Sequence, residues 1–221
     1  EAANTRAVIA LCVAEAAGAA SLKPARDLTD RLAVALVARS REQQLAHRAV
    51  HDQLTGLANS YGLQTQLERL LAQVGGAELA VLFIDLDGFK PVNDTFGHSS
   101  GDRVLEQVGQ RLKALARGSV AAARVGGDEF LLLTSRASDR DAVARLAERL
   151  IDVLSQPYKI DGREVAISCS VGIALYPDKC HPNKLIARAD AAMYTAKRAG
   201  RGTAVEWEQP TLVVPAQVMT A

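Results

Sequence analysis

The sequence has little cysteine and no excess of charge of either sign. Its three cysteines, Cys12, Cys169 and Cys180, are odd in number and lack the C-x-x-C spacing of zinc and thioredoxin-like sites, which favours a reduced, cytoplasmic compartment. Lys and Arg number 26 against 25 for Asp and Glu, giving a net charge of +1. The overall charge therefore gives no reason to expect binding to nucleic acid or to an anionic membrane, and a polyanionic ligand needs a local site.

The sequence also lacks an apolar run long enough to cross a bilayer. Its longest apolar stretch, residues 7–22, is rich in Ala and Gly, contains Glu15 and predicts a helix rather than a membrane span. It has no basic n-region, and the chain opens with Glu1 rather than Met, so we expect a piece of a longer protein and not a signal peptide. A longer parent protein of this kind is compatible with an upstream sensory domain or with a membrane domain that anchors it in the inner membrane.

Length and composition bound the number of domains. The 221 residues are 48% hydrophobic and 23% charged, close to the averages of soluble globular chains. They allow one full domain with a modest appendage and exclude two large domains. We place a boundary near residue 50, which gives helical linker or signalling helices over 1–50, a main domain over 51–207 and a tail or linker over 208–221.

The first segment carries almost no strand signal. From Asp27 to about Val50 the sequence predicts a charged helix in which Leu28, Leu32 and Leu36 recur at every fourth position. The repeat lasts about two turns, far short of the heptads that indicate a coiled coil. A helical linker or packing helix is the main interpretation, and a dimerising signalling helix is the alternative.

The main domain alternates helices and strands, which is typical of an α/β or α+β domain. Residues 79–84 form a continuous apolar run that predicts a strand buried on both faces. Gly126 and Gly127 separate two shorter strands and predict a hairpin. The strands of this hairpin are predicted over 120–125 and 129–134, and helices are predicted over 101–117, 138–155 and 184–199. A second hairpin is predicted over 158–175, with its turn at Asp161 and Gly162.

Acidic side chains stand at two predicted strand ends. Asp85 and Asp87 follow the buried strand, and Asp128 and Glu129 occupy the hairpin tip. If these strands are neighbours, the carboxylates converge and repel one another unless a cation lies among them. Such hard oxygen ligands suit magnesium, which usually takes one or two carboxylates together with substrate phosphates. Either pair alone is an ordinary strand end or turn, but the two together predict phosphoryl or nucleotidyl transfer.

A polar loop is predicted between the strand-end acids and the next helix. Its start, residues 88–90 with the sequence Gly-Phe-Lys, can offer backbone N–H groups and an ammonium to phosphate oxygens. Farther on, Asn93 and Asp102 can read a purine edge, since an amide meets a carbonyl and a carboxylate accepts from ring and exocyclic N–H groups. That combination favours guanine over adenine. His98, taken alone, is most simply a hydrogen-bonded loop histidine.

Four segments carry a resemblance to a known family. They read DQLTGLAN at 52–59, DLDGFKPVNDTFGHSSGD at 85–102, RVGGDEF at 124–130 and ADAAMYTAKRAGR at 189–201. In this order and at this spacing they resemble the successive motifs of the GGDEF family of diguanylate cyclases. The resemblance covers residues 51 to about 207, the range we predict for the main domain.

The resemblance implies an α+β fold like the adenylyl cyclase catalytic core and the polymerase palm. In that fold a central, mostly antiparallel sheet is flanked by helices, here with an N-terminal helical extension. It also implies that two GTP molecules condense to cyclic di-GMP and two pyrophosphates. Each domain of the family holds one GTP, and two domains face each other so that each 3′-hydroxyl attacks the other's α-phosphate. We therefore expect a homodimer, an inactive monomer and a cytoplasmic location for the domain.

The resemblance further implies roles for individual residues. Asp85, the backbone carbonyl of Leu86, Asp128 and Glu129 would bind Mg²⁺, or Mn²⁺ in its place, and Asp128 would also accept the proton of the 3′-hydroxyl. Positive charge would then face the triphosphate and the charge of the transition state. The implied substrate contacts are Asn93 and Asp102 for guanine, His98 at a further contact position, and the amides of Gly88 and Phe89 with Lys90, Lys197 and Arg201 for the phosphates.

The sequence departs from the family pattern at two places. Family members with product inhibition carry Arg-x-x-Asp before the Gly-Gly pair, whereas this chain has Arg117-Gly-Ser-Val120. Cyclic di-GMP loses a partner for its guanine edge there, so we expect weak or absent feedback inhibition at this degenerate site. The first motif ends in Asn59-Ser60 where the family often has Asn-Arg, and we expect a small effect.

The leading interpretation is an active cyclase, because none of the implied metal, base or phosphate positions is replaced. The alternative is a regulatory module that binds GTP and controls an attached EAL-type phosphodiesterase, and the proline-containing tail from Gln209 is compatible with a downstream domain. A cyclic di-GMP receptor acting through the Arg-x-x-Asp site is the least favoured function, because Val120 replaces the acid.

Overall fold

The computed structural model describes residues 22–74, 79–116, 120–135, 139–176 and 181–207. The chain divides into two compact units, Glu1–Ala49 and Val50–Ala221. Most of helix α2 (Leu22–Val50) lies in the first unit, and its Leu32 and Leu36 side chains are exposed. Within the ranges just given, no helix combines the length and apolarity that a membrane crossing needs. The predicted tail, 208–221, lies outside the described residues.

The second unit is built on a five-stranded sheet with the strand order β2-β3-β1-β6-β7. Every neighbouring pair is antiparallel except β6 and β7, so the prediction of a mostly antiparallel sheet is confirmed. The central strand is buried along its whole length because two neighbours and two helical layers cover it. The strands are β1 (Ala80–Asp87), β2 (Val120–Arg124), β3 (Glu129–Thr134), β6 (Ser168–Leu175) and β7 (Ala204–Glu206).

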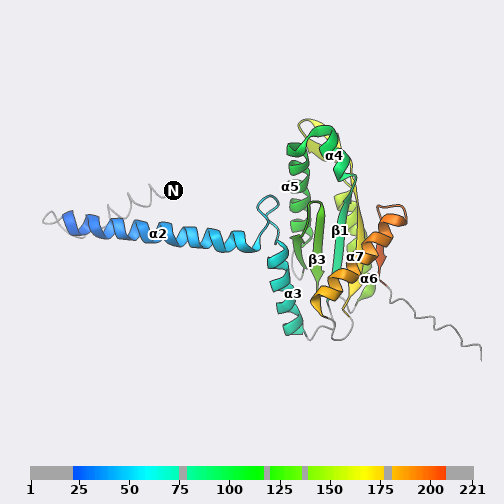
Figure 1. Ribbon diagram of the computed structural model, residues 1–221, viewed down its shortest axis with the longest axis horizontal. Helices are drawn as coiled ribbons and strands as arrows, with labels where there is room; N and C mark the ends of the chain where they lie inside the picture. The colour runs from blue at the N-terminus through cyan, green and yellow to red at the C-terminus, as the bar shows by residue number, and fades with distance from the viewer. Residues whose placement is uncertain (1–21, 75–78, 117–119, 136–138, 177–180, 208–221) are drawn as a thin grey trace, which may run out of the picture. The chain divides into compact units, whose positions relative to one another are not determined.

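Helices cover both faces of this sheet (Figure 1). Alternate residues of β1 enter two separate cores, because successive strand side chains point to opposite faces. Leu82 and Ile84 pack in the core that contains α5 (His98–Leu115) and α6 (Arg140–Leu154). Val81 and Phe83 pack in the core with α3 (Ser60–Val74) and α7 (Pro182–Arg198). The α+β fold with helical layers around the sheet is therefore confirmed.

The structure corrects two predicted boundaries near the strand-end acids. Strand β1 continues to Asp87, so Asp85 and Asp87 belong to the strand and pair with β6. The predicted loop after it is a helix, α4 (Phe89–Phe96). Pro91 fits in the first turn of α4 because its missing N–H has no intrahelical partner there. Phe89 and Val92, three residues apart, bury one face of this short helix.

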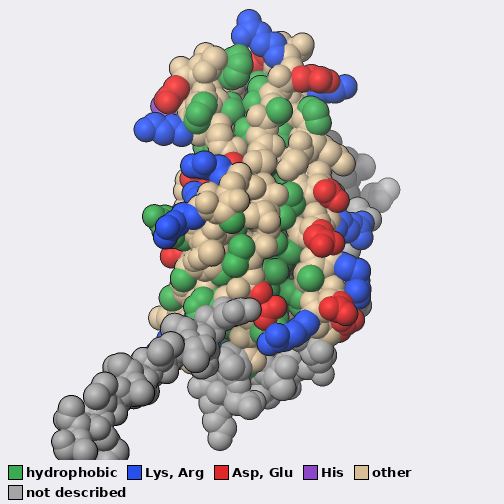
Figure 2. All heavy atoms as spheres, turned by 90° about the vertical axis from the view of Figure 1, so that its right-hand side faces the viewer, with side chains coloured by type: hydrophobic (Ala, Val, Ile, Leu, Met, Phe, Trp, Pro, Cys, Tyr) green, Lys and Arg blue, Asp and Glu red, His purple; other side chains and the backbone are tan. Residues whose placement is uncertain are grey.

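The predicted hairpin over 158–175 is two separate structures. Strands β4 (Tyr158–Ile160) and β5 (Arg163–Val165) pair around the predicted turn at Asp161 and Gly162 and form a small sheet of their own. The chain then enters β6, which lies beside β1 in the main sheet. On the face drawn in Figure 2, acidic and basic side chains are interspersed, in keeping with the near-zero net charge.

Candidate active site

The acids of the two strand ends come together as the sequence predicts. Strands β1 and β3 are neighbours, and Asp85 is the cross-strand partner of Glu129. The backbone N–H of Leu86 donates to the carbonyl oxygen of Asp128 at 3.2 Å. The tip of the β2–β3 hairpin therefore lies beside the C-terminal half of β1, and the site is fixed by the register of the sheet.

Burial and neighbouring carboxylates raise the pKa of two of these acids. Burial raises the pKa of Asp85, and the nearby charges of Asp128 and Asp87 raise it further, although the ammonium of Lys197 opposes the shift. Burial also raises the pKa of Glu129, together with the charges of Asp85 and Asp128. Lys197 Nζ lies 2.7 Å from Asp85 Oδ2. A negative cluster of this kind is stabilised by a cation, and here α7 supplies one from its last turn.

The donor set fits a magnesium ion that shares its coordination with substrate. Among the described residues, no three His, Cys, Asp or Glu side chains form a ready-made metal cage. Magnesium seldom needs one, because it is usually bound by one or two carboxylates, waters and substrate phosphates. Asp85 is buried while Asp128 and Glu129 are half-buried, so a substrate can reach the two hairpin acids.

Close packing at the hairpin tip explains the glycine at position 126. A Cβ atom at Gly126 would overlap Oε2 of Glu129, so a larger residue here would displace that carboxylate. The guanidinium of Arg124 donates to the carbonyl of Gly127 from Nε at 3.2 Å and from Nη2 at 2.8 Å. These contacts hold the backbone of the tip next to the acids.

A second layer of contacts holds Arg124, and the sequence interpretation assigned it no role. Arg124 Nη1 lies 3.3 Å from Asp52 Oδ1, and Asp52 also accepts from the amide and hydroxyl of Thr55. Burial raises the pKa of Asp52, but the bonds from Thr55 and the charge of Arg124 outweigh it and lower the pKa overall. The only sequence feature that could have indicated this contact is the D-x-L-T segment that begins at Asp52. Its partner, Arg124, lies 72 residues farther along the chain.

Asp87 lies on the same face of β1 as Asp85 but has partners of its own. Its carboxylate accepts from the hydroxyls of Ser168 and Ser170 and from the backbone N–H of Gly202. Arg201 Nε lies 3.7 Å from Asp87 Oδ1. The prediction that both strand acids join the same cluster is therefore true of Asp85, whereas Asp87 is bound to β6 and to the turn after α7.

The residues predicted to hold phosphates lie around the same end of the sheet. Gly88 is the N-cap of α4 and supplies no capping side chain, and Lys90 is exposed in the first turn. Helix N-termini attract anions because their first N–H groups have no intrahelical partner. Lys197 and Arg201 come from the end of α7 and the turn beyond it, where each contacts one aspartate of β1.

The residues predicted to read guanine lie on α4 and α5, which meet at Gly97. A Cβ atom at Gly101 would overlap Oδ1 of Asn93, so the Asn93 amide rests against the backbone next to Asp102. Asp102 and His98 are exposed in the first turns of α5. The structure therefore places the Asn93 amide against Gly101, the residue that precedes Asp102 in the chain.

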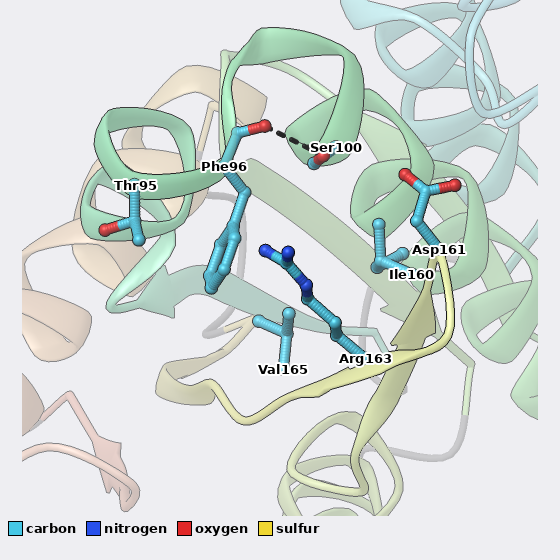
Figure 3. A pocket seen from close by; sticks show the side chains of 7 residues that line it. All are labelled: Thr95, Phe96, Ser100, Ile160, Asp161, Arg163 and Val165. Carbon is cyan, nitrogen blue, oxygen red and sulfur yellow. Dashed lines mark hydrogen bonds between the residues drawn. The ribbon is translucent and has the colours of Figure 1, made fainter.

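A hollow of about 310 Å³ lies between the α4–α5 junction and the β4–β5 hairpin (Figure 3). Phe96 and Ser100 line it from the helices, and Arg163 and Val165 line it from the hairpin. The Arg163 guanidinium lies 5.9 Å from the centre of the Phe96 ring. None of the predicted site residues lines this hollow.

The degenerate inhibitory site is only partly within the described residues. Val120 is the first residue of β2. Arg117 lies outside the described residues.

Comparison with known proteins agrees with this architecture. The sequence profile of the family described as "Diguanylate cyclase, GGDEF domain" matches residues 49–203. MucR of Pseudomonas aeruginosa, a bifunctional diguanylate cyclase/cyclic di-GMP phosphodiesterase, is 48% identical over 176 residues, which are 78% of this chain and 25% of that protein. The diguanylate cyclase TpbB of Pseudomonas aeruginosa is 45% identical over 164 residues, which are 72% of this chain and 38% of that protein.

Solved structures give the same result. The GGDEF domain of TpbB aligns with a TM-score of 0.67 at 41% identity, covering 72% of this chain and 94% of that one. The coiled coil and GGDEF domain of DgcB from Caulobacter crescentus, solved in complex with c-di-GMP, aligns with a TM-score of 0.73 at 32% identity, covering 82% and 97%. The chain belongs to the GGDEF-domain family of diguanylate cyclases. It spans 25% of the length of MucR and 38% of that of TpbB.

Proposed function

We propose that the chain is a diguanylate cyclase that condenses two GTP molecules into cyclic di-GMP and two pyrophosphates. In each half of the reaction, the 3′-oxygen of one GTP forms a bond to the α-phosphorus of the other, and the bond from that phosphorus to the pyrophosphate oxygen breaks. The hydroxyl proton passes to a protein base. The observation that carries the proposal is the convergence of Asp85, Asp128 and Glu129 beside Lys197 at one end of the sheet.

The metal-binding groups in this proposal are the carboxylates of Asp85, Asp128 and Glu129 and the carbonyl of Leu86. They would hold Mg²⁺, or Mn²⁺ in its place. When bound, the ion supplies a Lewis acid that polarises phosphate oxygens. Asp128 is the proposed acceptor of the 3′-hydroxyl proton. Its half-buried place at the hairpin tip supports this role, because an incoming ribose can approach the tip from solvent.

The phosphate-binding groups surround that cluster. The amides of Gly88 and Phe89 open α4, where the helix N-terminus favours an anion. Lys90 and Arg201 are exposed, so their charges can reach the triphosphate, and Arg201 can do so while its Nε stays beside Asp87. Lys197 pairs with Asp85, and its side chain is 30% exposed, so it can turn to a phosphate oxygen.

The guanine-binding groups are Asn93 and Asp102, with His98 as a further substrate contact. An Asp carboxylate accepts from the N1–H and N2–H groups of guanine, and the Asn amide can donate to its carbonyl. Adenine presents no such pair of donors. The support for this assignment is the packing of the Asn93 amide against Gly101, the residue that precedes Asp102 in the chain.

Because each domain holds one GTP in this proposal, catalysis needs two copies of the chain. A second copy supplies the other GTP, whose α-phosphate receives the attack. Exposed apolar side chains on α2, among them Leu32, Leu36 and Leu45, favour the interpretation of α2 as a dimerising signalling helix over that of a simple linker. An enzyme that uses GTP in this way would work in the cytoplasm.

The proposal includes weak feedback by the product. Val120 stands where product-inhibited members of the family carry an acid, so one partner for guanine is missing. We expect that excess cyclic di-GMP leaves the initial rate of wild type nearly unchanged, and that Val120→Asp introduces inhibition. Initial rates across a titration of product measure this. Strong inhibition of wild type by micromolar product would contradict the proposal of a degenerate site.

The test of the activity is identification of the product. Purified chain is incubated with GTP and Mg²⁺, and the nucleotides are separated by chromatography and identified by mass spectrometry. The proposal predicts cyclic di-GMP and pyrophosphate in a ratio of one to two. Linear pppGpG or GDP as the end product would contradict it, since either would show that only part of the reaction, or a different hydrolysis, takes place.

A second candidate function is a regulatory module that binds GTP and controls an attached EAL-type phosphodiesterase. It is favoured by one observation, the similarity to MucR, whose name joins a cyclase to a phosphodiesterase and of which the chain covers 25%. Equilibrium binding of GTP together with the product assay separates the two functions. Tight GTP binding without conversion at any protein concentration supports the regulatory module, and conversion supports the cyclase.

A further inference from the structure

The carboxylate of Asp87 is buried and surrounded by donors from distant parts of the chain. Its side chain is 5% exposed. The hydroxyl of Ser170 donates to it at 2.9 and 3.0 Å, and the hydroxyl of Ser168 donates at 3.2 Å. The backbone N–H of Gly202 donates at 3.2 Å from a position 115 residues along the chain. A carboxylate this deep is stable only when such donors replace its water shell.

The turn that Asp87 contacts has an unusual backbone. Arg201 has φ of +65°, a left-handed conformation that side-chain-bearing residues seldom adopt and that costs about 1 kcal/mol or more. Surrounding contacts must therefore maintain it. Within residues 199–203 the contacts that reach β1 are the Gly202 N–H bond and the Arg201 ion pair, and both go to Asp87. Asp87 thus connects the end of β1 to this turn.

The ion pair leaves most of the Arg201 guanidinium available to a ligand. Its Nε atom faces Asp87 at 3.7 Å, while the side chain is 64% exposed. A guanidinium held at Nε presents its two terminal nitrogens as a fork, the arrangement that matches two oxygens of a phosphate. We propose that Asp87 is a positioning residue that fixes the 200–202 turn and aims the Arg201 guanidinium at the nucleotide phosphates.

This inference rests on the proposed function in one respect, namely that Arg201 contacts the phosphates of GTP. It separates two aspartates that look alike in the sequence. A carboxylate oxygen of Asp85 contacts Lys197 near the hairpin acids. The carboxylate oxygens of Asp87 instead accept hydrogen bonds from Ser168, Ser170 and the turn. Asp87 therefore acts through Arg201 and does not need to contact the substrate.

The test is a double-mutant cycle on GTP affinity, measured by calorimetry on the full chain. Asp87→Asn keeps the shape of the side chain and removes its charge, and we expect a loss of about three- to tenfold in GTP affinity. Arg201→Ala should cost at least as much. In the Arg201→Ala background, Asp87→Asn should cause little further loss, because the residue through which it acts is gone.

Two controls keep the result interpretable. Asp152→Asn removes the same charge from an exposed position on α6, on the other face of the sheet, and should leave GTP affinity unchanged. If Asp87→Asn does not fold, Ser170→Ala removes a hydroxyl bond to the same carboxylate and enters the same cycle. Circular dichroism and melting temperature are recorded for every variant.

Two outcomes would overturn the inference. One is an undiminished GTP affinity in a folded Asp87→Asn chain. The other is a loss of the same size with and without Arg201, which would show that Asp87 only stabilises the fold. The cycle needs no turnover, so it is separable from the proposed function. A chain that makes no cyclic di-GMP but shows the coupling between Asp87 and Arg201 contradicts the cyclase and leaves this inference standing.

Discussion

The two halves of the candidate site are built in different ways. The acid half lies on β1 and the β2–β3 hairpin, where backbone pairing with two neighbouring strands fixes Asp85 and Lys197 pairs with its carboxylate. The guanine half lies on two helices that meet at Gly97, with His98 and Asp102 exposed and a hollow of about 310 Å³ behind the junction. The proposed catalytic charges therefore lie on paired strands, whereas the residues proposed to read guanine lie on two short connected helical ends beside a hollow.

The contacts across that hollow are few and exposed. Arg103 pairs with Asp161 on the β4–β5 turn, and Arg163 lies over the ring of Phe96. Exposed pairs of this kind contribute at most about 1 kcal/mol each. The hydroxyl of Ser100 donates to the carbonyl of Phe96 within the junction itself. Compared with the sheet end, the junction has weaker polar contacts, so we expect it to adjust more readily if a nucleotide binds there.

The largest effect should come from breaking the acid half. Asp128→Asn removes the proposed base and one cation ligand while leaving a turn residue of the same shape. We expect turnover to fall by about a hundredfold or more, in the range of general-base catalysis, with an unchanged circular dichroism spectrum. Initial rates of cyclic di-GMP formation measure it. Product formation at the wild-type rate would remove Asp128 from the mechanism.

Breaking the guanine half should affect binding rather than chemistry. In Gly101→Ala the added methyl group overlaps Oδ1 of Asn93, so the amide must move away from position 101. We expect GTP affinity to fall by about tenfold and the preference for GTP over ITP, which lacks the exocyclic amine, to shrink. Ser99→Ala, on an exposed position of the same junction, is the matched control. Equal losses for GTP and ITP would show that guanine is read elsewhere.

Removing the support of the hairpin tip should lower stability. Asp52→Asn loses the charge that pairs with Arg124, and we expect a loss of about 1–2 kcal/mol of unfolding free energy at pH 7. Because the folded pKa of Asp52 is lowered from 3.8, its contribution is present above pH 3.8 and disappears as the pH falls through the lower folded value.

The measurement for Asp52 is urea unfolding of both proteins at pH 7, 5 and 3. The deficit of Asp52→Asn should be the same at pH 7 and pH 5 and smaller at pH 3. Glu148→Gln, an exposed acid on α6, serves as the control. A deficit that grows toward acid pH would mean that the pKa of Asp52 is not lowered in the folded chain.

The smallest expected effect is a gain in stability within the acid half. Burial and neighbouring carboxylates raise the pKa of Glu129, so its charge is unfavourable in the folded chain without a cation. After allowance for solvent screening, Glu129→Gln should raise the melting temperature by about 1–2 °C in metal-free buffer while it reduces turnover. Differential scanning calorimetry with and without Mg²⁺ and GTP measures both states. A lower melting temperature in metal-free buffer would contradict the mutual repulsion of these acids.

The sequence predicts the acid half well for physical reasons. An apolar run ending in acids indicates a buried strand, and two glycines before two acids indicate a hairpin, so the convergence of Asp85 with Asp128 and Glu129 could be inferred. Helix α4 was missed because it is short, is flanked by Gly88 and Gly97 and buries only Phe89 and Val92. Such a segment has too little periodicity to separate a helix from a loop.

Contacts between distant residues could not be predicted. The pairing of Asp52 with Arg124 spans 72 residues, and the bond from Gly202 to Asp87 spans 115. Local patterns contain no information on such partners. For the same reason the different environments of Asp85 and Asp87 appear only when β6 and the turn after α7 are placed beside β1.

The central claim is that each chain holds one GTP and that two chains are needed for the reaction. The most direct test measures the initial rate of cyclic di-GMP formation over a wide range of protein concentration at saturating GTP and Mg²⁺. The account predicts that the rate rises more steeply than in proportion to the protein concentration until the dimer is saturated. A specific activity that stays constant down to concentrations at which the chain is monomeric by light scattering would contradict it.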